Sequence, residues 1–444
     1  MSQASSCVQN RKSRCLTASQ IAKDSGRFEQ WSQYNHLVVG SYHTDIPVHL
    51  KQDVEDVFNN FRRLPESWIN KDSTTYARLQ KDLGQEFLAF LQSAQVSSPS
   101  IFSPKAKRKE SQQLLRELQN VFLAFQKLEK LRDSEKTWTE ADYAAQVYNV
   151  LRATVGLLSD NRAHCPISLP QPLNEHVVTK KAALNLNART IRPDGSLFVP
   201  RHEIAELSEE EKSPFNVLAQ RRNTNNSASH GGASSFKWQS TLCSKLPAQP
   251  GFEVASCFWE DKKPEQKELE VAYRQNRMAT TAALRQLHAL RIEAPVFGLV
   301  WAEGTVRAHV DWYKEEDGRF TIVSAPYPGP PPEQPVRRKQ LFHSWNLADP
   351  GHIIQVYLLL RKLDRWTVTG FRDRVVTGIR SLVDEVEKHD GKVVQWRRRS
   401  SLGKDMGRTD EHEYEPESIS SPAKPRARGK AAKQAKRRTT RGAV

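Results

Sequence analysis

The sequence lacks segments that would anchor it in a membrane. Its longest apolar run, Ile353–Leu360, is interrupted by Gln355 and falls far short of the ~20 apolar residues that a membrane-spanning helix needs. The stretch from Met1 to Gln20 is polar and contains no apolar segment of the kind that a signal peptide carries. These absences predict a soluble protein inside the cell, with no membrane as a partner.

Cysteine is also scarce, and its positions argue against two common kinds of site. The cysteines show neither the paired spacing of a zinc motif nor the density of a disulfide scaffold: Cys7, Cys15, Cys165, Cys243 and Cys257. His43 and His49 have no cysteine partners at a metal-ligand spacing, so zinc is not expected. Because the cysteines do not suggest disulfides, we expect a reducing compartment. The chain also contains no P-loop and no internal repeat.

Acidic residues are missing from one long segment. Ser421–Val444 contains none, and its nine basic residues supply more than half of the net charge of +16: Lys424, Arg426, Arg428, Lys430, Lys433, Lys436, Arg437, Arg438 and Arg441. Such a segment has too little apolar surface to fold alone. Basic runs of this kind serve as nuclear-import signals, as nucleic-acid-binding arms, or both. We therefore predict a nuclear protein whose partners are DNA and the import machinery.

The rest of the sequence is organised around Val254–Leu290, a short apolar strand that runs into a long helix. Alternation along the strand places Phe258, Glu260 and Lys262 on one side, each about 7 Å from the next. Charges at the end of a buried strand cost roughly several kcal/mol unless they are paired or bind a metal. The helix is expected to begin near Pro264, and its stripe is apolar except for one asparagine: Leu269, Ala272, Asn276, Ala279, Ala283, Leu287 and Leu290.

Short motifs occur along the chain in an informative order. A glutamate near the start of a predicted helix, Glu140, is followed by Asp194 directly after a proline, then by Glu260 and Lys262, and then by Gln275 on the long helix. This order resembles the PD-(D/E)XK nuclease superfamily, whose members share the restriction-endonuclease-like fold. The resemblance covers roughly residues 136–325. More loosely, the chain is similar to uncharacterised fungal proteins that carry such a domain.

The resemblance implies hydrolysis of phosphodiester bonds in DNA, with Mg²⁺ or Mn²⁺ as the cofactor. Asp194 and Glu260 would hold the metal, joined by the main-chain carbonyl of Asp261, because hard cations prefer oxygen ligands. Lys262 would orient or help deprotonate the attacking water and would stabilise charge near the scissile phosphate. Gln275 and Glu140, the remaining candidate catalytic residues, would support the site.

The expected fold class is α/β. A restriction-endonuclease-like core, with a mixed central sheet flanked by helices, would follow a helical N-terminal region and precede a disordered basic tail. We assign residues 1–30 to a disordered N-terminus, 31–135 to the helical region, 136–390 to the core and 391–444 to the tail. A low-complexity insert near 219–235 absorbs much of the gap of about 65 residues between Asp194 and Glu260, at little entropic cost.

Periodicity places the other elements. Helical patterns lie at 48–61, 75–92, 111–131, 138–158, 351–363 and 368–389. Val296–Trp301 and Thr305–Tyr313 predict a hairpin that turns at Glu303-Gly304.

Each site motif also has an ordinary structural explanation. Glu260 and Lys262 are compatible with a solvated strand end, and a Pro-Asp-Gly sequence around Asp194 is a good turn. Glu140 lies three residues after a threonine, which is the spacing of a helix capping box. Gln275 needs no function on a polar helix face.

A rival group and a rival function also follow from the sequence. Arg307, His309 and Asp311 alternate along one strand face, where they favour either phosphate or acid–base chemistry or a salt-bridged structural role. The function that competes with an enzyme is a catalytically inactive nucleic-acid-binding or scaffold protein that keeps the nuclease-like fold, because site residues are necessary for cleavage without demonstrating it.

Overall fold

The structure is a computed structural model that describes residues 16–59, 63–106, 108–136, 138–173, 182, 186, 188–220, 233–263, 268–330, 342–389 and 393–397, with the backbone alone at 108–110, 233–235 and 389. The basic segment Ser421–Val444 and most of the predicted insert at 219–235 lie outside the described residues.

The helices are α1 (Ala18–Lys23), α2 (Ser25–Tyr34), α3 (Val48–Phe58), α4 (Thr74–Leu83), α5 (Gln85–Ser97), α6 (Arg108–Arg132), α7 (Glu140–Tyr143), α8 (Asn149–Val155), α10 (Pro214–Gln220), α11 (Ala233–Gln239), α12 (Leu269–Ala289), α13 (Pro350–Trp366) and α14 (Arg372–His389). π-helical turns, Ala144–Tyr148 and Thr367–Phe371, join α7 to α8 and α13 to α14. The strands are β1 (Leu37–Val39), β2 (Leu64–Pro65), β3 (Phe102–Ser103), β4 (Asp160–Ala163), β5 (Ile167–Ser168), β6 (Thr190–Ile191), β7 (Gly195–Phe198), β8 (Ala255–Asp261), β9 (Val296–Ala302), β10 (Thr305–Glu316), β11 (Arg319–Pro326) and β12 (Trp345–Asn346).

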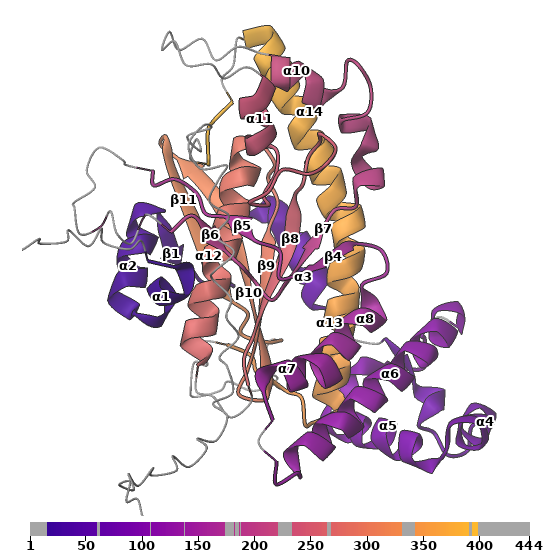
Figure 1. Cartoon of the computed structure of the whole chain (residues 1–444). Coiled ribbons are helices and arrows are strands. Elements are labelled where there is room, and N and C mark those ends of the chain that lie inside the picture. The colour runs from indigo at the N-terminus through magenta and orange to yellow at the C-terminus, as the bar shows by residue number, and fades with distance from the viewer. Residues whose placement is uncertain are drawn as a thin grey trace, which may run out of the picture. The chain divides into compact units, whose positions relative to one another are not determined.

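Eight strands form one mixed sheet. Their order is β1-β11-β10-β9-β8-β7-β4, with β12 beside β10. The pairs β8–β9 and β1–β11 are parallel, and the other neighbours are antiparallel. The connection from β8 to β9 passes through α12, as a crossover between parallel strands requires. A large mixed sheet flanked by helices confirms the predicted α/β class (Figure 1).

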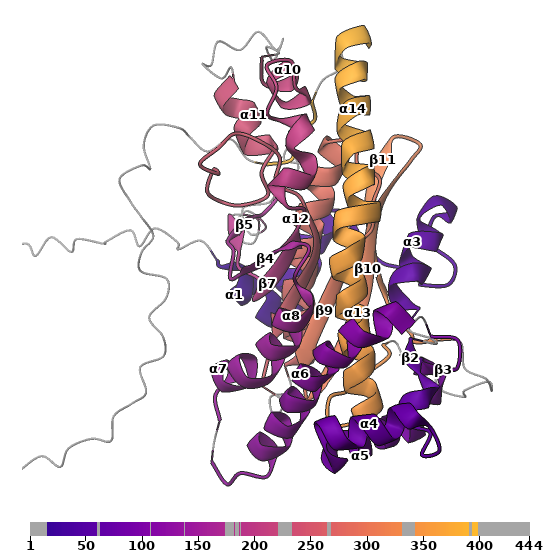
Figure 2. The same ribbon diagram turned by 90° about the vertical axis from the view of Figure 1, so that its right-hand side faces the viewer.

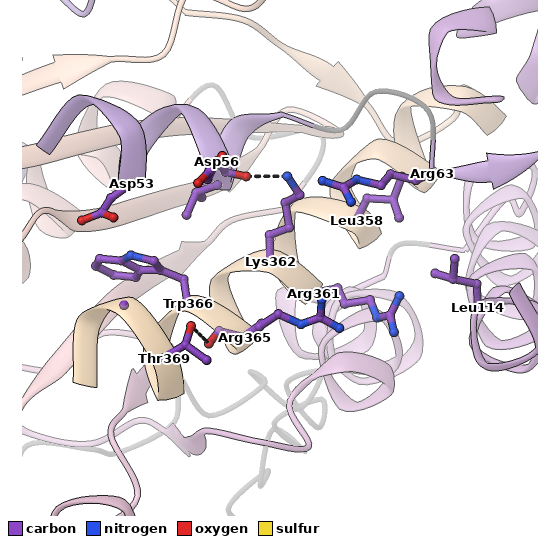
Figure 3. Close-up of a pocket in the computed structure, with 12 residues that line it drawn as sticks. Asp53, Asp56, Arg63, Leu114, Leu358, Arg361, Lys362, Arg365, Trp366 and Thr369 are labelled. Atoms are coloured by element: carbon purple, nitrogen blue, oxygen red, sulfur yellow. Dashed lines mark hydrogen bonds between the residues drawn. The ribbon is translucent and has the colours of Figure 1, made fainter. Parts of the chain in front are cut away.

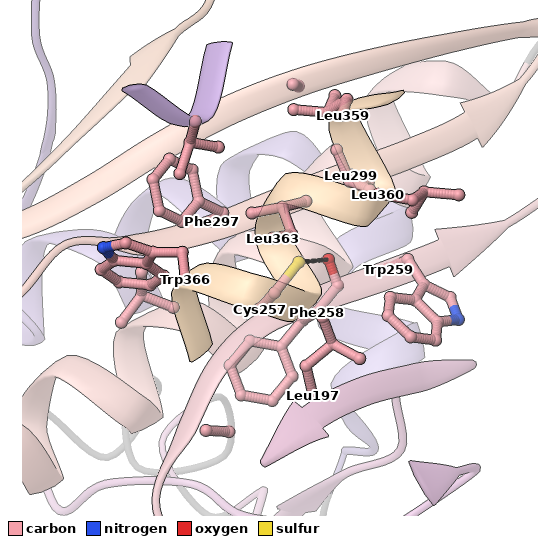
Figure 4. Packing of buried hydrophobic residues seen from close by; sticks show 14 of the residues in the cluster. Leu197, Cys257, Phe258, Trp259, Phe297, Leu299, Leu359, Leu360, Leu363 and Trp366 are labelled. Carbon is pink, nitrogen blue, oxygen red and sulfur yellow. Dashed lines mark hydrogen bonds between the residues drawn. The ribbon is translucent and has the colours of Figure 1, made fainter. Parts of the chain in front are cut away.

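Helices cover both faces of this sheet. Gly298 of β9 lies against Asn276 of α12, whereas its neighbour Phe297 meets Trp366 of α13 edge-on, with ring centroids 5.0 Å apart. Since neighbouring residues of a strand point to opposite faces, α12 and α13 lie on opposite sides of the sheet. Figure 4 shows the α13 side, where Leu363 packs over Cys257. All seven residues of β8 are therefore buried, which explains a nearly continuous apolar run there.

The helical region packs on α13. Helices α3, α5 and α6 all contact it (Figure 2). The single helix predicted over 75–92 is wrong, because Gly84 separates α4 from α5 with a φ of +85°, a conformation that glycine adopts without strain. Helix α6 follows the predicted period, and its apolar side chains are buried: Leu114, Leu118, Val121, Phe125 and Leu128.

The predicted hairpin is confirmed. Strand β9 pairs antiparallel with β10, and Ala302 lies opposite Thr305. The two turn residues, Glu303 and Gly304, have φ values of 55° and 67°, as a two-residue turn of type I′ requires.

Predicted disorder is wrong in two segments. Thr17 caps α1, Asp24 caps α2, and these helices bury Phe28 and Trp31, although they overlap the N-terminal stretch assigned to disorder. In the segment assigned to the tail, Trp396 is 1% exposed and its Nε1–H donates to the carbonyl of Gln239 at 2.9 Å. Tertiary contacts order both segments despite their polar composition. None of the described helices is long and apolar enough to cross a membrane.

Candidate active site

Pairing between β7 and β8 places Asp194 beside Glu260. The antiparallel register pairs Gly195 with Trp259, so the next step sets Asp194 opposite Glu260 on the same face. A Cβ at position 195 would lie 2.1 Å from the Trp259 ring, so only glycine permits this approach. The backbone N–H of Asp261 donates to Asp194 Oδ2 at 2.7 Å, which fixes the carboxylate at the end of β8.

Lys262 completes this cluster from the same strand. Its Nζ lies 3.4 Å from Glu260 Oε1, on the side that alternation predicts. The second oxygen of Glu260, Oε2, is buried and has no hydrogen-bond partner among the described residues. The structure therefore holds a buried acceptor next to a second carboxylate, Asp194, and one ammonium group.

The electrostatics follow from this crowding. Burial raises the pKa of Glu260 well above its usual range, and the neighbouring Asp194 carboxylate raises it further. Burial also raises the pKa of Asp194, with repulsion from Asp261 added. Burial acts against the ammonium of Lys262, but the carboxylates of Glu260, Glu140 and Asp194 outweigh it and raise the pKa of Lys262. Lys262 is accordingly a cation at neutral pH.

Glu140 contributes from α7. Burial raises its pKa, and the nearby Lys262 ammonium opposes that rise, which places the carboxylate within the electrostatic range of the cluster. The capping role predicted for Glu140 is wrong. The capping box of α7 consists of Thr139 and Asp142, each accepting a hydrogen bond from the other's backbone N–H, and Glu140 is the first helical residue after the cap. The alternative cap, Thr137, lies outside the described residues.

Gln275 has a hydrogen-bond partner outside this cluster. Its side chain donates to Ser19 Oγ of α1 at 3.1 Å. Among the residues that the structure describes, it makes no hydrogen bond to Asp194, Glu260 or Lys262. The structure thus brings Asp194, Glu260 and Lys262 together, with Glu140 within electrostatic range, and Gln275 joins α12 to α1.

Two residues that the sequence did not reveal support the cluster. Arg152 of α8 binds the Asp261 carboxylate through both of its terminal nitrogens, at 2.8 and 2.5 Å, and both side chains are buried, with exposures of 4% and 5%. Its guanidinium lies 4.5 Å from the centroid of Trp301 and 4.9 Å from that of Trp259. Asp261 alternates with Glu260, so this ion pair holds the strand end from the opposite face of the sheet.

The second is His164, in the turn after β4. Its backbone N–H donates to the carbonyl of Asp194 at 3.2 Å, and its Nδ1 lies 3.5 Å from Asp194 Oδ1. Neither His164 nor Arg152 stands in a motif, and only the fold brings them to Asp194 and Asp261. A sequence pattern of apolar and polar residues carries no signal for such long-range pairs.

No protein-family model matches the chain, and no curated protein matches it either. The site must therefore be judged by its own chemistry.

The donor set fits one hard cation only in part. Within the described ranges, no group of three or more His, Cys, Asp and Glu side chains is arranged to hold a metal ion. Asp194 and Glu260 supply two carboxylates, and Glu260 Oε2 is a buried oxygen without a partner. Mg²⁺ commonly takes one or two protein carboxylates and completes its octahedron with water and substrate phosphate. A site of that kind requires no third protein carboxylate.

The side chains of the rival group on β10 are engaged with neighbouring side chains. His309 Nδ1 lies 2.8 Å from Asp311 Oδ1, and its Nε2 lies 2.8 Å from Asn276 Oδ1. Thr280 of α12 also donates to Asp311, and the side chains of His309 and Asp311 are fully buried. Arg307 pairs with Glu303 at 3.3 Å. These contacts agree with the salt-bridged interpretation of this strand face. They also explain why the polar Asn276 stands in the apolar stripe of α12, because its side chain binds His309.

Two cysteines far apart in the sequence meet beside β4. The Sγ atoms of Cys165 and Cys243 lie 3.3 Å apart, and both thiols are free. A hydrogen bond from Cys243 lowers the pKa of Cys165 to about 7. Cys165 is therefore the more reactive member of the pair, because the thiolate is the nucleophilic form.

Proposed function

We propose that this protein is a nuclear, Mg²⁺-dependent nuclease-like protein that hydrolyses phosphodiester bonds in DNA. The observation that carries the proposal is the convergence of Asp194, Glu260 and Lys262 at the end of β8, with Glu140 nearby. Within the large sheet, the antiparallel neighbours β4, β7 and β8 are followed by a crossover through α12 to the parallel strand β9, and this arrangement supports a restriction-endonuclease-like core.

Each residue of the site would have a separate role in the reaction. Asp194 and Glu260 would hold Mg²⁺, which when bound neutralises phosphate charge and lowers the pKa of the attacking water. Lys262, held as an ammonium by its carboxylate neighbours, is suited to stabilise the charge that develops on the phosphate oxygens. An efficient general base has a pKa near the working pH. Glu140, whose pKa is raised, is therefore better suited to accept a proton than Lys262, which is already protonated. Arg152 and Asp261 position the strand end without touching substrate.

The experiment is cleavage of plasmid and single-stranded DNA with Mg²⁺, Mn²⁺ or EDTA. Glu260→Gln and Lys262→Met should each lower the cleavage rate by about 10²–10³-fold, as the loss of a group that stabilises a transition state does. Lys263→Met, at the neighbouring position, is the matched control and should cleave like the wild type. Thermal melts of all variants separate a loss of chemistry from a loss of folding.

A specific observation favours the alternative, a catalytically inactive DNA-binding or scaffold protein. Lys262 already neutralises Glu260 through a buried ion pair, so the cluster is partly satisfied without a metal. Wild-type protein that binds DNA but cuts no substrate with either metal would establish that alternative. The nuclear setting rests on the basic segment Ser421–Val444 and is tested with it below.

A further inference from the structure

The face of the sheet opposite Glu260 carries a cavity. A cavity of about 340 Å³ opens between α3, α6 and α13, as Figure 3 shows. Its walls come from Val57 of α3, Leu114 of α6, and Leu358 and Trp366 of α13, together with charged side chains described below. Because α13 covers the face opposite α12, this cavity is separate from the cluster of Asp194, Glu260 and Lys262.

The charged lining is predominantly basic. One of the two acids is neutralised, because Asp53 pairs with Arg374 at 2.6 Å, whereas Asp56 accepts a hydrogen bond from the neutral amide of Gln52 at 3.0 Å and keeps its charge. Four cations line the cavity: Arg63, Arg361, Lys362 and Arg365. Arg361 pairs with Glu117 at 3.4 Å. Across the described part of the chain, the side chains of the other three cations form no salt bridge.

Lys362 shows how positive this environment is. Its Nζ donates to the backbone carbonyl of Asp56, a neutral partner. Burial lowers the pKa of Lys362 to about 8, and the guanidiniums of Arg63 and Arg365 act in the same direction, while Asp56 opposes them. Arg63, Lys362 and Arg365 therefore share one nearby carboxylate, that of Asp56, and this excess of positive charge favours a further anion among them.

The other wall of the cavity is apolar. Val57, Leu114 and Leu358 supply aliphatic surface, and Trp366 adds an indole that is 7% exposed. The indole Nε1–H is buried and has no acceptor among the described residues. This apolar wall and the cations without salt bridges are complementary to a ligand with an anionic end and a flat, largely apolar end.

We propose that this cavity binds a nucleoside monophosphate, with the phosphate ester between Arg63, Lys362 and Arg365 and the base against the apolar wall. The volume is near the lower limit of ligand pockets, about 300–1,000 Å³, which suits one nucleotide rather than a nucleic-acid chain. Charge-assisted hydrogen bonds from arginine and lysine are the usual means of binding a phosphate ester. The same chemistry recognises a free nucleotide and the 5′-phosphorylated end of a strand.

The test is isothermal titration of the full chain with AMP, CMP, adenosine and inorganic phosphate. AMP or CMP should bind at one site, and adenosine or phosphate alone should bind at least about tenfold more weakly, because each supplies half of the contacts. Arg365→Gln and Lys362→Met should each weaken nucleotide binding by about tenfold or more. Arg365 is exposed, so its replacement should not affect folding. Arg365→Gln therefore still tests the proposal if Lys362→Met lowers the melting temperature.

Two controls separate this site from others. Arg380→Gln removes an exposed arginine of α14 and should leave nucleotide affinity unchanged. Glu260→Gln should also leave it unchanged, which distinguishes this site from the proposed nuclease site whether or not the protein cleaves DNA. Competition of AMP by a 5′-phosphorylated oligonucleotide would identify strand ends as the natural ligand, and no competition would identify the free nucleotide. Absence of saturable AMP and CMP binding, or equal affinity in Arg365→Gln, overturns the proposal.

Discussion

Replacing Arg152 by methionine tests whether the buried Arg152–Asp261 ion pair stabilises the end of β8. Arg152 and Asp261 form a bidentate ion pair that is almost fully buried, with side-chain exposures of 4% and 5%. Methionine keeps much of the volume but removes the charge, so the Asp261 carboxylate would stay buried without its partner. The backbone N–H of Asp261 also holds Asp194, so a displaced strand end would disturb the site itself.

The size of the effect follows from burial. Removing one partner of a buried ion pair costs about 3–5 kcal/mol, because the remaining charge is left in a poorly solvating environment. The guanidinium also makes cation–π contacts with Trp259 and Trp301. Each such contact contributes about 0.5–2 kcal/mol, so the expected loss of stability lies near the upper end of about 3–5 kcal/mol. Since domains are stable by only about 5–15 kcal/mol, this loss is easily measured.

The assay is urea unfolding followed by tryptophan fluorescence and circular dichroism. Arg152→Met should lower the free energy of unfolding by about 3–5 kcal/mol. The double variant Arg152→Met/Asp261→Asn should recover at least about 1 kcal/mol, because a neutral amide is easier to bury than a carboxylate. Lys388→Met, which breaks an exposed pair of α14, should cost less than about 0.5 kcal/mol. A loss below about 1 kcal/mol in Arg152→Met, or no recovery in the double variant, would refute the buried ion pair.

Three further predictions concern the tail, the metal and the thiols. Deletion of Ser421–Val444 should abolish nuclear accumulation and flatten the plot of log affinity for DNA against log salt, by about 0.9 for each phosphate that the segment neutralises; an unchanged slope and localisation would show that the segment does neither. Because burial raises the pKa values of Glu260 and Asp194, protons compete with the cation, so Mn²⁺ affinity should fall as the pH is lowered from about 8 to about 6; affinity that is independent of pH would contradict this. Iodoacetamide should alkylate Cys165 before Cys243 and Cys257, since the pKa of Cys165 is about 7 whereas burial raises that of Cys257; peptide mass spectrometry with equal labelling of all three would disprove that order.

Local periodicity explains what could be predicted from the sequence. Strand β8, helix α12 and the hairpin β9–β10 follow from alternation, a helical stripe and a Glu-Gly turn, because each pattern is satisfied within a few consecutive residues. The spacing of Glu260 and Lys262 likewise predicts that they share a face, and the structure places them 3.4 Å apart. These features depend on neighbours in the chain.

What could not be predicted depends on contacts between distant segments. Helices α1 and α2 are short and polar, and they are ordered by burial of Phe28 and Trp31 and by a hydrogen bond from Arg274 to Ala22. Arg152 and Asp261 are 109 residues apart, and no local pattern indicates their pairing. Two threonines, Thr137 and Thr139, each stand three residues before an acidic residue and fit a capping box, and only the backbone geometry identifies Thr139 as the cap of α7.

Binding of Mn²⁺ in the absence of DNA tests the central claim, that Asp194 and Glu260 form one cation site. Titration followed by electron paramagnetic resonance reports free Mn²⁺ directly. The wild type should bind Mn²⁺ saturably, Asp194→Asn and Glu260→Gln should each abolish that binding, and Lys263→Met should retain it. No saturable binding by the wild type, or unchanged binding in both carboxylate variants, would contradict a metal site at the end of β8.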